Sequence, residues 1–355
     1  MSGVGSPPRA AAEGGRSQFR LSLEAAAEAA REHGIRYDWM RRLRHLLLAG
    51  RSIESLERET PRVFARSAAL FPLLETRLVR RMTVQDGAIK LLIGLVDGHA
   101  VETVVLPTAR GVSVCLSSQV GCPVGCTFCA SGRAGLVRNL ETHEIVEQLV
   151  HARRVCQEVD RLVMMGIGEP LLNADALFAA LDQIRFEGKI GPRRMIVSTV
   201  GTKGAIQRLS DWGAPATLAV SLHAPDDELR ARLIPSLARS RIDRLLQETD
   251  DYIRRTGRKG LAAYTLIRAV NDSDEQARAV GNLLRGREIY LNVIPYNRVP
   301  GVAYEPVSAE RARRFVDLVR ANGAFATVRK TMGSAQNAAC GQLRASTVLD
   351  ETGGI

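Results

Sequence analysis

The sequence has no long apolar run, few aromatic residues and no cysteine-rich pattern. None of its 355 residues belongs to a run of 18 or more consecutive apolar residues, so we expect no membrane-spanning helix. Aromatic residues make up only 5%, which argues against an extended surface for stacking unpaired bases. Six scattered cysteines are unlike a secreted disulfide framework, and the first residues lack the apolar core of a signal peptide. We therefore expect a cytoplasmic protein with reduced thiols.

The charge is strongly positive, with a formal net value of +11. Such a balance favours a polyanionic partner such as nucleic acid. The alternative is a set of arginine-rich, solvated helix faces without a partner. Charge alone leaves both open.

The chain divides by pattern into five segments. Apolar residues recur at helical spacing in the second segment, and Asp-Gly turns separate short apolar runs in the third. We expect a disordered tail (1–18), a small helical accessory domain that is a candidate for RNA binding (19–76), a β-meander linker (77–110), an α/β barrel with a C-terminal cysteine loop (111–346) and a second tail (347–355).

From residue 111 onward, strands and amphipathic helices alternate. This alternation predicts parallel strands with right-handed crossovers, and six units fit an open six-stranded (β/α)6 partial barrel. Ligands of such folds bind at the carboxyl ends of the strands. The predicted strands are Val112–Ser117, Leu162–Met165, Met195–Ser198, Thr217–Leu222, Ala262–Ile267 and Ile289–Ile294.

Three cysteines follow the first predicted barrel strand in the spacing C-x3-C-x2-C. Cys122, Cys126 and Cys129 have no fourth cysteine nearby. Structural zinc sites and ferredoxin clusters normally use four protein ligands, whereas three thiolates leave one iron of a cluster open for chemistry. The alternative is a zinc site completed by a distant histidine such as His143.

Polar residues follow other predicted strands at the same edge. Gly168 allows close backbone approach after the second strand, and the carboxylate of Glu169 can accept hydrogen bonds from an ammonium group. Hydroxyls and an imidazole end the third and fourth strands, and Asn297 follows the sixth. We expect ligands for ribose, carboxylate or adenine here.

Two more cysteines extend the pattern: Cys115, seven residues before Cys122, and Cys340, which has small neighbours near the C-terminus. With them, the chain resembles the RlmN/Cfr family of radical S-adenosylmethionine (SAM) RNA adenosine methyltransferases from about residue 79 to 346. The matching segments are Val101–Val104, Cys115–Cys122, Arg138–Leu140, Met165–Asn173, Ser221–Ala224, Val270–Asp272, Val328–Thr331 and Ala338–Leu343.

The resemblance implies a [4Fe-4S] cluster on Cys122, Cys126 and Cys129, and two SAM molecules per turnover. The first SAM methylates Cys340; the second is cleaved to a 5′-deoxyadenosyl radical that removes hydrogen from this methyl group. The resulting thiomethylene radical adds to adenine and forms a protein–RNA crosslink. Glu102 or Cys115 takes the ring proton, and Cys115 then attacks Cys340, so a disulfide forms and the methylated adenosine leaves.

The resemblance also supplies partners and SAM contacts. It implies carbon 2 of an adenosine in 23S rRNA as the target, tRNA as a second substrate, a flavodoxin- or ferredoxin-type electron donor, no membrane and a monomer. The implied SAM-binding residues are Gly168, Glu169, Ser198, Ser221, Leu222, His223 and Asn297.

Three departures from the family pattern concern the substrate rather than the radical chemistry. Ala263 stands where an acidic residue is expected, Leu136 replaces an aromatic residue, and the segment from Met332 is less acidic than usual. They leave methylation at carbon 8 of the same adenosine as the nearest alternative. More distant alternatives are a glycyl-radical activase and an RNA-binding protein with a structural zinc.

Overall fold

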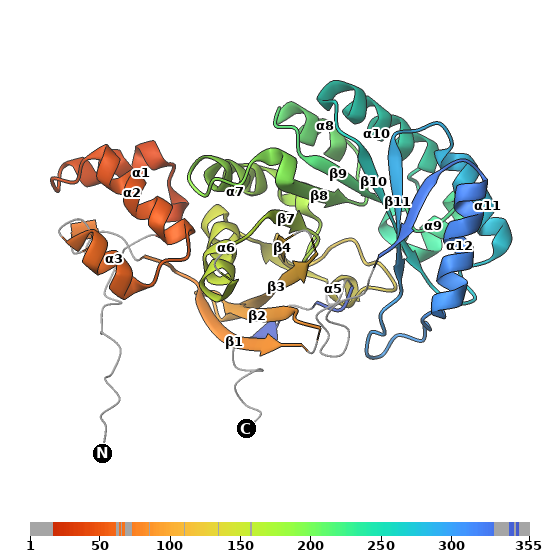
Figure 1. The fold of residues 1–355 in the computed structure, drawn as a ribbon, viewed down its shortest axis with the longest axis horizontal. Helices are drawn as coiled ribbons and strands as arrows, with labels where there is room; N and C mark the ends of the chain where they lie inside the picture. Colours follow the sequence, from red (N-terminus) through yellow and green to blue (C-terminus); the bar gives the residue numbers. More distant parts are fainter. Residues whose placement is uncertain are drawn as a thin grey trace, which may run out of the picture.

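The computed structural model describes residues 17–61, 64, 66–67, 73–84, 86–109, 111–133, 135–156, 158–329, 341–343 and 346–347. Its centre is one curved sheet with helices on its outer side (Figure 1). Neighbouring strands run parallel from β4 to β12 in the order β4-β7-β8-β9-β10-β11-β12. These strands are β4 (Gly111–Cys115), β7 (Arg161–Met164), β8 (Met195–Thr199), β9 (Thr217–Ser221), β10 (Gly260–Leu266), β11 (Ile289–Pro295) and β12 (Phe325–Val328).

The predicted open α/β barrel is confirmed, and the structure adds one strand to it. Six strand–helix units are followed by β12, which pairs in parallel with β11. The sequence analysis did not assign β12, which is only four residues long, and three of these residues are exposed. The helices after these strands are α5 (Ala130–Arg133), α6 (Thr142–Cys156), α7 (Ala174–Phe186), α8 (Ala205–Asp211), α9 (Asp227–Leu233), α10 (Ile242–Thr256), α11 (Asp274–Leu284) and α12 (Ala309–Ala321).

Helix α11 illustrates why these segments are helical and dock on the sheet. Ser273 caps its first turn, and the side chain of Gln276 accepts a hydrogen bond from the backbone N–H of Ser273, which completes a capping box. Ala277, Val280 and Leu284 are buried at helical spacing and form the apolar face. Packing of such faces against the strands forms the main core.

The β-meander continues the barrel sheet. Strands β1 (Arg77–Thr83), β2 (Ile89–Gly94) and β3 (His99–Thr108) pair antiparallel, and β3 pairs antiparallel with β4. A short strand near the C-terminus, β13 (Ser346–Thr347), pairs with the start of β3. Thr347, which we assigned to a tail, is therefore part of the sheet.

The N-terminal helices α1 (Leu23–Arg31), α2 (Tyr37–Leu48) and α3 (Ile53–Glu59) lie beside α6 and α7 (Figure 1). The preceding 3-10 helix, η1 (Gln18–Arg20), packs on α6. Ser17 and Gln18 are buried, and Ser17 Oγ donates to Glu147 at 2.5 Å. The predicted tail therefore extends two residues too far.

A buried ion pair holds this region to the barrel. Arg44 of α2 is fully buried, and it contacts both carboxylate oxygens of Glu187 at 2.7 and 2.9 Å. Its remaining terminal nitrogen donates to the carbonyl oxygens of Gln18 and Leu21 at 2.9 and 3.0 Å. Every terminal nitrogen of this cation thus has an acceptor.

The substitution Arg44→Met is expected to lower the free energy of unfolding by about 3–5 kcal/mol, because Glu187 would remain buried without its counter-charge. Urea unfolding measures the change. Arg208→Met is the matched control, since Arg208 pairs with Asp175 on the surface and its loss should cost less than about 1 kcal/mol. Equal costs for the two variants would contradict this account.

Within the part of the chain that the structure describes, no helix has the length and apolar character needed to cross a membrane.

Candidate functional site

The three clustered cysteines lie on the loop between β5 (Gln119–Gly121) and α5. The small sheet of β5 and β6 (Leu136–Asn139) supports this loop, and Cys122 N–H donates to the carbonyl oxygen of Gly135 at 2.8 Å. All three side chains join one apolar cluster with Phe128 and with residues that follow β8, β9, β10 and β11. The structure therefore brings the cysteines together at the carboxyl ends of the strands.

Burial keeps the thiols of Cys122 and Cys126 protonated in the absence of a bound metal. It raises the pKa of Cys122 to about 12 and that of Cys126 well above its usual value, and the neighbouring Cys129 and Glu169 add to both increases. Thiolates form here only when a bound metal displaces the protons.

The described side chains contain no group of three His, Cys, Asp or Glu residues arranged around a single metal ion. In an iron–sulfur cluster each thiolate binds a different iron, so three cysteines that hold a cluster need not converge on one metal ion. His143, which the zinc alternative requires, lies in α6 with Nε2 only 3.2 Å from Oε2 of Glu75. The geometry therefore favours the cluster.

Glu169 is a buried carboxylate beside the thiols. Its Oε2 accepts a hydrogen bond from Val200 N–H at 3.0 Å, while its Oε1 is buried without a hydrogen-bond partner among the described residues. Burial raises its pKa to about 7, and the neighbouring donor groups of Thr199, Val200 and Leu171 partly oppose this rise. An unsatisfied carboxylate oxygen in this position fits a ligand's ammonium group.

The backbone before Glu169 packs closely on the loop after β4. Gly168 has a φ of +104°, and a Cβ there would lie 2.7 Å from Cβ of Gln119. Gln119 Oε1 accepts a hydrogen bond from Glu169 N–H at 2.8 Å. Glycine at position 168 therefore lets this turn approach the cysteine segment.

Arg230 is a site residue that the sequence analysis missed. Its side chain, on α9, is only 1% exposed. Nη2 donates hydrogen bonds to the carbonyl oxygens of Val200 and Ser221 at 2.7 and 3.0 Å. Nε donates to the carbonyl oxygen of Leu222. Its Nη1 is buried without a partner among the described residues. Burial lowers its pKa to about 10, partly offset by the nearby Cys126. Glu169 thus binds the backbone N–H of Val200, and Arg230 binds its carbonyl oxygen. Each of the two side chains also has one buried polar atom without a partner among the described residues.

The other predicted SAM-binding residues lie at the same ends of the strands. Ser198 is the penultimate residue of β8, Ser221 ends β9, Leu222 follows it, and Asn297 lies two residues beyond β11. Leu222 is fully buried and Asn297 nearly so, whereas Ser198 and Ser221 are partly exposed.

His223 has a fixed tautomer. Thr265 N–H donates to Nδ1 at 2.9 Å, so the neutral ring carries its proton on Nε2. Burial lowers the pKa of His223 to about 3, which keeps the ring neutral. Its backbone has a φ of +58°, and Asn271 stabilises that turn by donating to its carbonyl oxygen at 2.8 Å. The ring is therefore a hydrogen-bond donor at neutral pH.

Glu102 and Cys115 occupy adjacent strands, β3 of the meander and β4 of the barrel. Cys115 ends β4 opposite Val104 of β3, and Glu102 lies two residues from Val104 on the same face. Both side chains are buried, and Ser117 Oγ donates to the carbonyl oxygen of Glu102 at 2.7 Å. The opposite face of β3 packs on α6, where Thr103 donates to Gln148 at 2.8 Å. Glu102 and Cys115 thus face away from α6.

Cys340 lies outside the described residues, but the residues that follow it are anchored to the cysteine loop. The carbonyl oxygen of Gly341 accepts a hydrogen bond from Ala130 N–H at 2.8 Å, next to Cys129. Ser131 Oγ donates to the carbonyl oxygen of Leu343 at 2.5 Å. From there the C-terminal segment reaches β3.

Two of the three departures lie within the described residues. Ala263 is buried between Ser221 and Asn292, directly opposite both in the sheet register. Leu136 is 43% exposed on β6, where it pairs with Gly121 beside the cysteine loop. Met332 lies outside the described residues.

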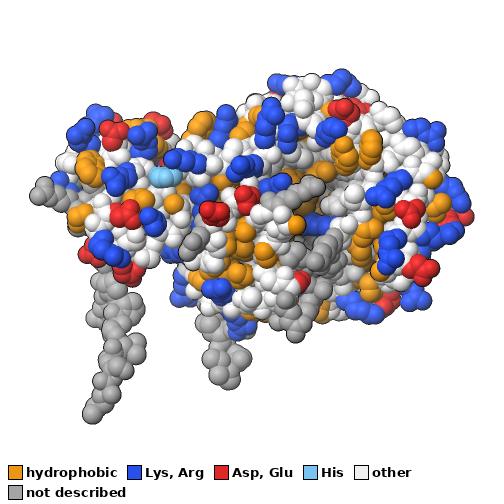
Figure 2. Space-filling model, in the orientation of Figure 1, with side chains coloured by type: hydrophobic (Ala, Val, Ile, Leu, Met, Phe, Trp, Pro, Cys, Tyr) orange, Lys and Arg blue, Asp and Glu red, His pale blue; other side chains and the backbone are white. Residues whose placement is uncertain are grey.

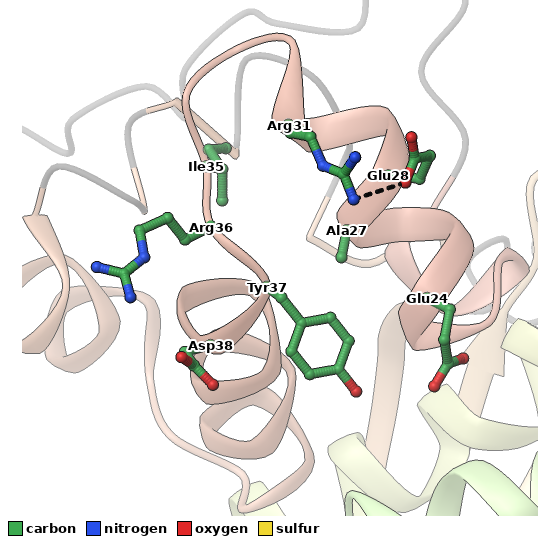
Figure 3. Close-up of a pocket in the computed structure, with 8 residues that line it drawn as sticks. All are labelled: Glu24, Ala27, Glu28, Arg31, Ile35, Arg36, Tyr37 and Asp38. Carbon is green, nitrogen blue, oxygen red and sulfur yellow. Dashed lines mark ion pairs between the residues drawn. The ribbon is translucent and has the colours of Figure 1, made fainter.

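A pocket of about 550 Å³ lies in the N-terminal helical region (Figure 3). The side chains of Glu24, Tyr37 and Asp38 line it, and Arg31 pairs with Glu28 at 3.0 Å. Arg36 also lines the pocket, so charges of both signs surround it, and RNA binding by this region stays a prediction.

Comparisons with known proteins agree with this geometry. The family model of the radical SAM superfamily matches residues 116–279. "Probable dual-specificity RNA methyltransferase RlmN" of a Synechococcus species is 42% identical over 85% of this chain and 88% of its own length; the protein of the same name from Gloeobacter violaceus is 42% identical over 86% and 89%.

A solved structure supports the same assignment. A radical SAM methyltransferase from Sphaerobacter thermophilus is 37% identical, with a TM-score of 0.86 over 93% of this chain and 99% of its own. Sequence identity and fold thus agree over nearly the whole chain. The chain therefore belongs to the RlmN family of radical SAM methyltransferases.

Proposed function

We propose that this protein methylates carbon 2 of an adenosine in 23S rRNA, and in tRNA as a second substrate, through a methylated Cys340 and a Cys115–Cys340 disulfide. One observation carries the proposal. The residue after Cys340 is hydrogen-bonded beside Cys129, while β13 of the same C-terminal segment pairs with β3, the strand of Glu102. The segment thus connects the cluster loop to the strand with the proposed base.

The described residues fit a cluster and SAM. Cys122, Cys126 and Cys129 would hold three irons, Glu169 Oε1 the ammonium group of SAM, and Arg230 Nη1 its carboxylate, because each of these two atoms is buried and unsatisfied. The remaining SAM contacts are proposed for Gly168, Ser198, Ser221, Leu222, His223 and Asn297. When bound, the cluster and SAM supply the methyl group and the radical that removes hydrogen from it.

The chain's own thiols and carboxylate perform the later steps. Glu102 takes the proton from carbon 2 of the crosslinked adenine, and the unpaired electron of the adduct would pass to a one-electron acceptor, a role that the oxidised cluster would fill when bound. Cys115 then attacks the Cys340 sulfur and breaks its bond to the transferred carbon. The electron pair stays on that carbon, which takes up a proton and becomes the methyl group. A reductant must reopen the disulfide before the next turnover.

RNA as the substrate is supported by charge and by the relatives. Figure 2 shows Lys and Arg side chains spread over the N-terminal helices and the barrel on one face, consistent with the net charge of +11. The RlmN relatives are named as probable dual-specificity RNA methyltransferases. Because a stacked adenosine must leave its helix to reach a barrel interior, we expect free rRNA to be methylated faster than assembled subunits.

Nucleoside mass spectrometry tests the target carbon. The cluster-loaded protein is incubated without oxygen with SAM, reductant and either a 23S rRNA transcript or tRNA. We expect 2-methyladenosine from both RNAs and none from the Cys340→Ala variant. 8-Methyladenosine would overturn the carbon assignment, and cleavage of SAM without methylated RNA would overturn the substrate.

A further inference from the structure

A second buried charge lies beside Glu102. Lys90 of β2 places Nζ 2.7 Å from Oε1 of Glu102, and the two side chains are only 11% and 6% exposed. Removing a lysine from water costs several kcal/mol unless a counter-charge compensates. The family comparison and the proposed mechanism give Lys90 no role.

The strand register places Lys90 on the proposed reactive face. Lys90 lies opposite Val104 in the β2–β3 pair, and Val104 lies opposite Cys115 in the β3–β4 pair. Directly opposed residues of antiparallel strands point to the same face. Lys90 and Cys115 therefore flank Val104 in one row across three strands, with Glu102 two residues along β3.

Other charged or titratable side chains lie on the strands next to Glu102. Arg80 of β1 lies opposite Leu92, which in turn lies opposite Glu102; Arg80 is thus on the same face but two strands away and exposed. Cys115 lies on the same face, opposite Val104, and α6 covers the other face through Thr103. Lys90 is a buried cation in direct contact with Glu102.

We propose that Lys90 is a positioning residue that keeps Glu102 ionised and oriented toward the adenine until Glu102 takes the carbon-2 proton. This inference rests on the proposed function. A base must be unprotonated before it acts, and a carboxylate buried without a cation takes up a proton. The ammonium group of Lys90 prevents this and, through its hydrogen bond to Oε1, restricts the orientation of the carboxylate.

The test is the pH dependence of methylated-RNA formation in Lys90→Met and Lys90→Arg. Methionine retains an unbranched apolar stem but removes the charge. We expect the rate of Lys90→Met to fall about 10- to 100-fold at pH 7 and to recover toward pH 9, because a buried carboxyl without a nearby cation is mostly protonated at neutral pH, with roughly one in 10 to one in 100 ionised. Lys90→Arg should keep the wild-type profile. A loss of rate in Lys90→Met that is uniform across pH would overturn the inference.

Two further measurements separate this inference from the proposed function. Protein mass spectrometry should show full methylation of Cys340 in Lys90→Met, because that step needs no base at Glu102. In Glu102→Gln, the additional change Lys90→Met should have little further effect, since the group that Lys90 supports is already lost. A wild-type protein that methylates no RNA would overturn the proposed function. If the wild type is active but the rate losses of Lys90→Met and Glu102→Gln multiply in the double variant, only the proposed role of Lys90 would be overturned.

Discussion

Replacement of Cys115 by alanine is expected to stop turnover and to leave the protein covalently attached to its RNA. In the proposed mechanism, Cys115 alone attacks the Cys340 sulfur, so without it the bond between Cys340 and adenine persists. Cys115 ends β4 on the face it shares with Glu102, where its thiol can meet a reaction partner. Denaturing gel electrophoresis with labelled RNA should show an adduct approaching one RNA per active protein.

Cys156→Ala is the matched control for this experiment. Cys156 ends α6, is partly buried, and its Sγ contacts the carbonyl oxygens of Ala152 and Glu158 at 3.2 and 3.5 Å. Its removal should leave turnover unchanged and trap no RNA. Continued turnover of Cys115→Ala, or equal adduct in both variants, would contradict the assignment of Cys115 as the resolving thiol.

The substitution Arg230→Met is expected to weaken SAM binding to the cluster-loaded protein roughly 30- to 700-fold. Truncating one partner of a buried, charged hydrogen bond costs about 2–4 kcal/mol, which corresponds to that range. The predicted contact is the unsatisfied Nη1, while Nη2 and Nε hold the ends of β8 and β9. Equilibrium dialysis with labelled SAM measures the affinity without requiring turnover.

Arg230→Lys and Glu169→Gln serve as companions. Lysine retains the charge and should recover part of the affinity, whereas glutamine retains an acceptor for Val200 N–H but loses the charge opposite the SAM ammonium group. Circular dichroism checks that each variant is folded, and iron and sulfide analysis checks that each has a full cluster. Wild-type affinity in folded, cluster-loaded Arg230→Met would rule out the carboxylate contact.

Local spacing was enough to predict the barrel and the cysteine loop. Cys122, Cys126 and Cys129 are close in sequence, so a single loop brings them together. The strands that carry Ser198 and Ser221 near their carboxyl ends appear as short apolar runs between amphipathic helices. Parallel strands point their carboxyl ends in the same direction. Polar residues that directly follow such strands can therefore be assigned to one edge of the sheet from the sequence alone.

The missed features depend on tertiary contacts. Arg230 stands in an amphipathic segment rich in charges, where an arginine is usually solvated, and only the packing of α9 on the cysteine loop buries it. Lys90 similarly interrupts an apolar strand, and its partner Glu102 is twelve residues away on the next strand. The docking of the N-terminal helices depends on Arg44 and Glu187, which are 143 residues apart.

The most direct test of the central claim uses SAM whose methyl group carries three deuterium atoms. If the carbon travels through Cys340 and loses one hydrogen there, the adenosine product carries two deuterium atoms and one hydrogen from solvent. Direct transfer of an intact methyl group would retain all three. Mass spectrometry of the product nucleoside distinguishes the two: a product with two deuterium atoms is the result that we predict, and a product with three would contradict the cysteine-bound intermediate.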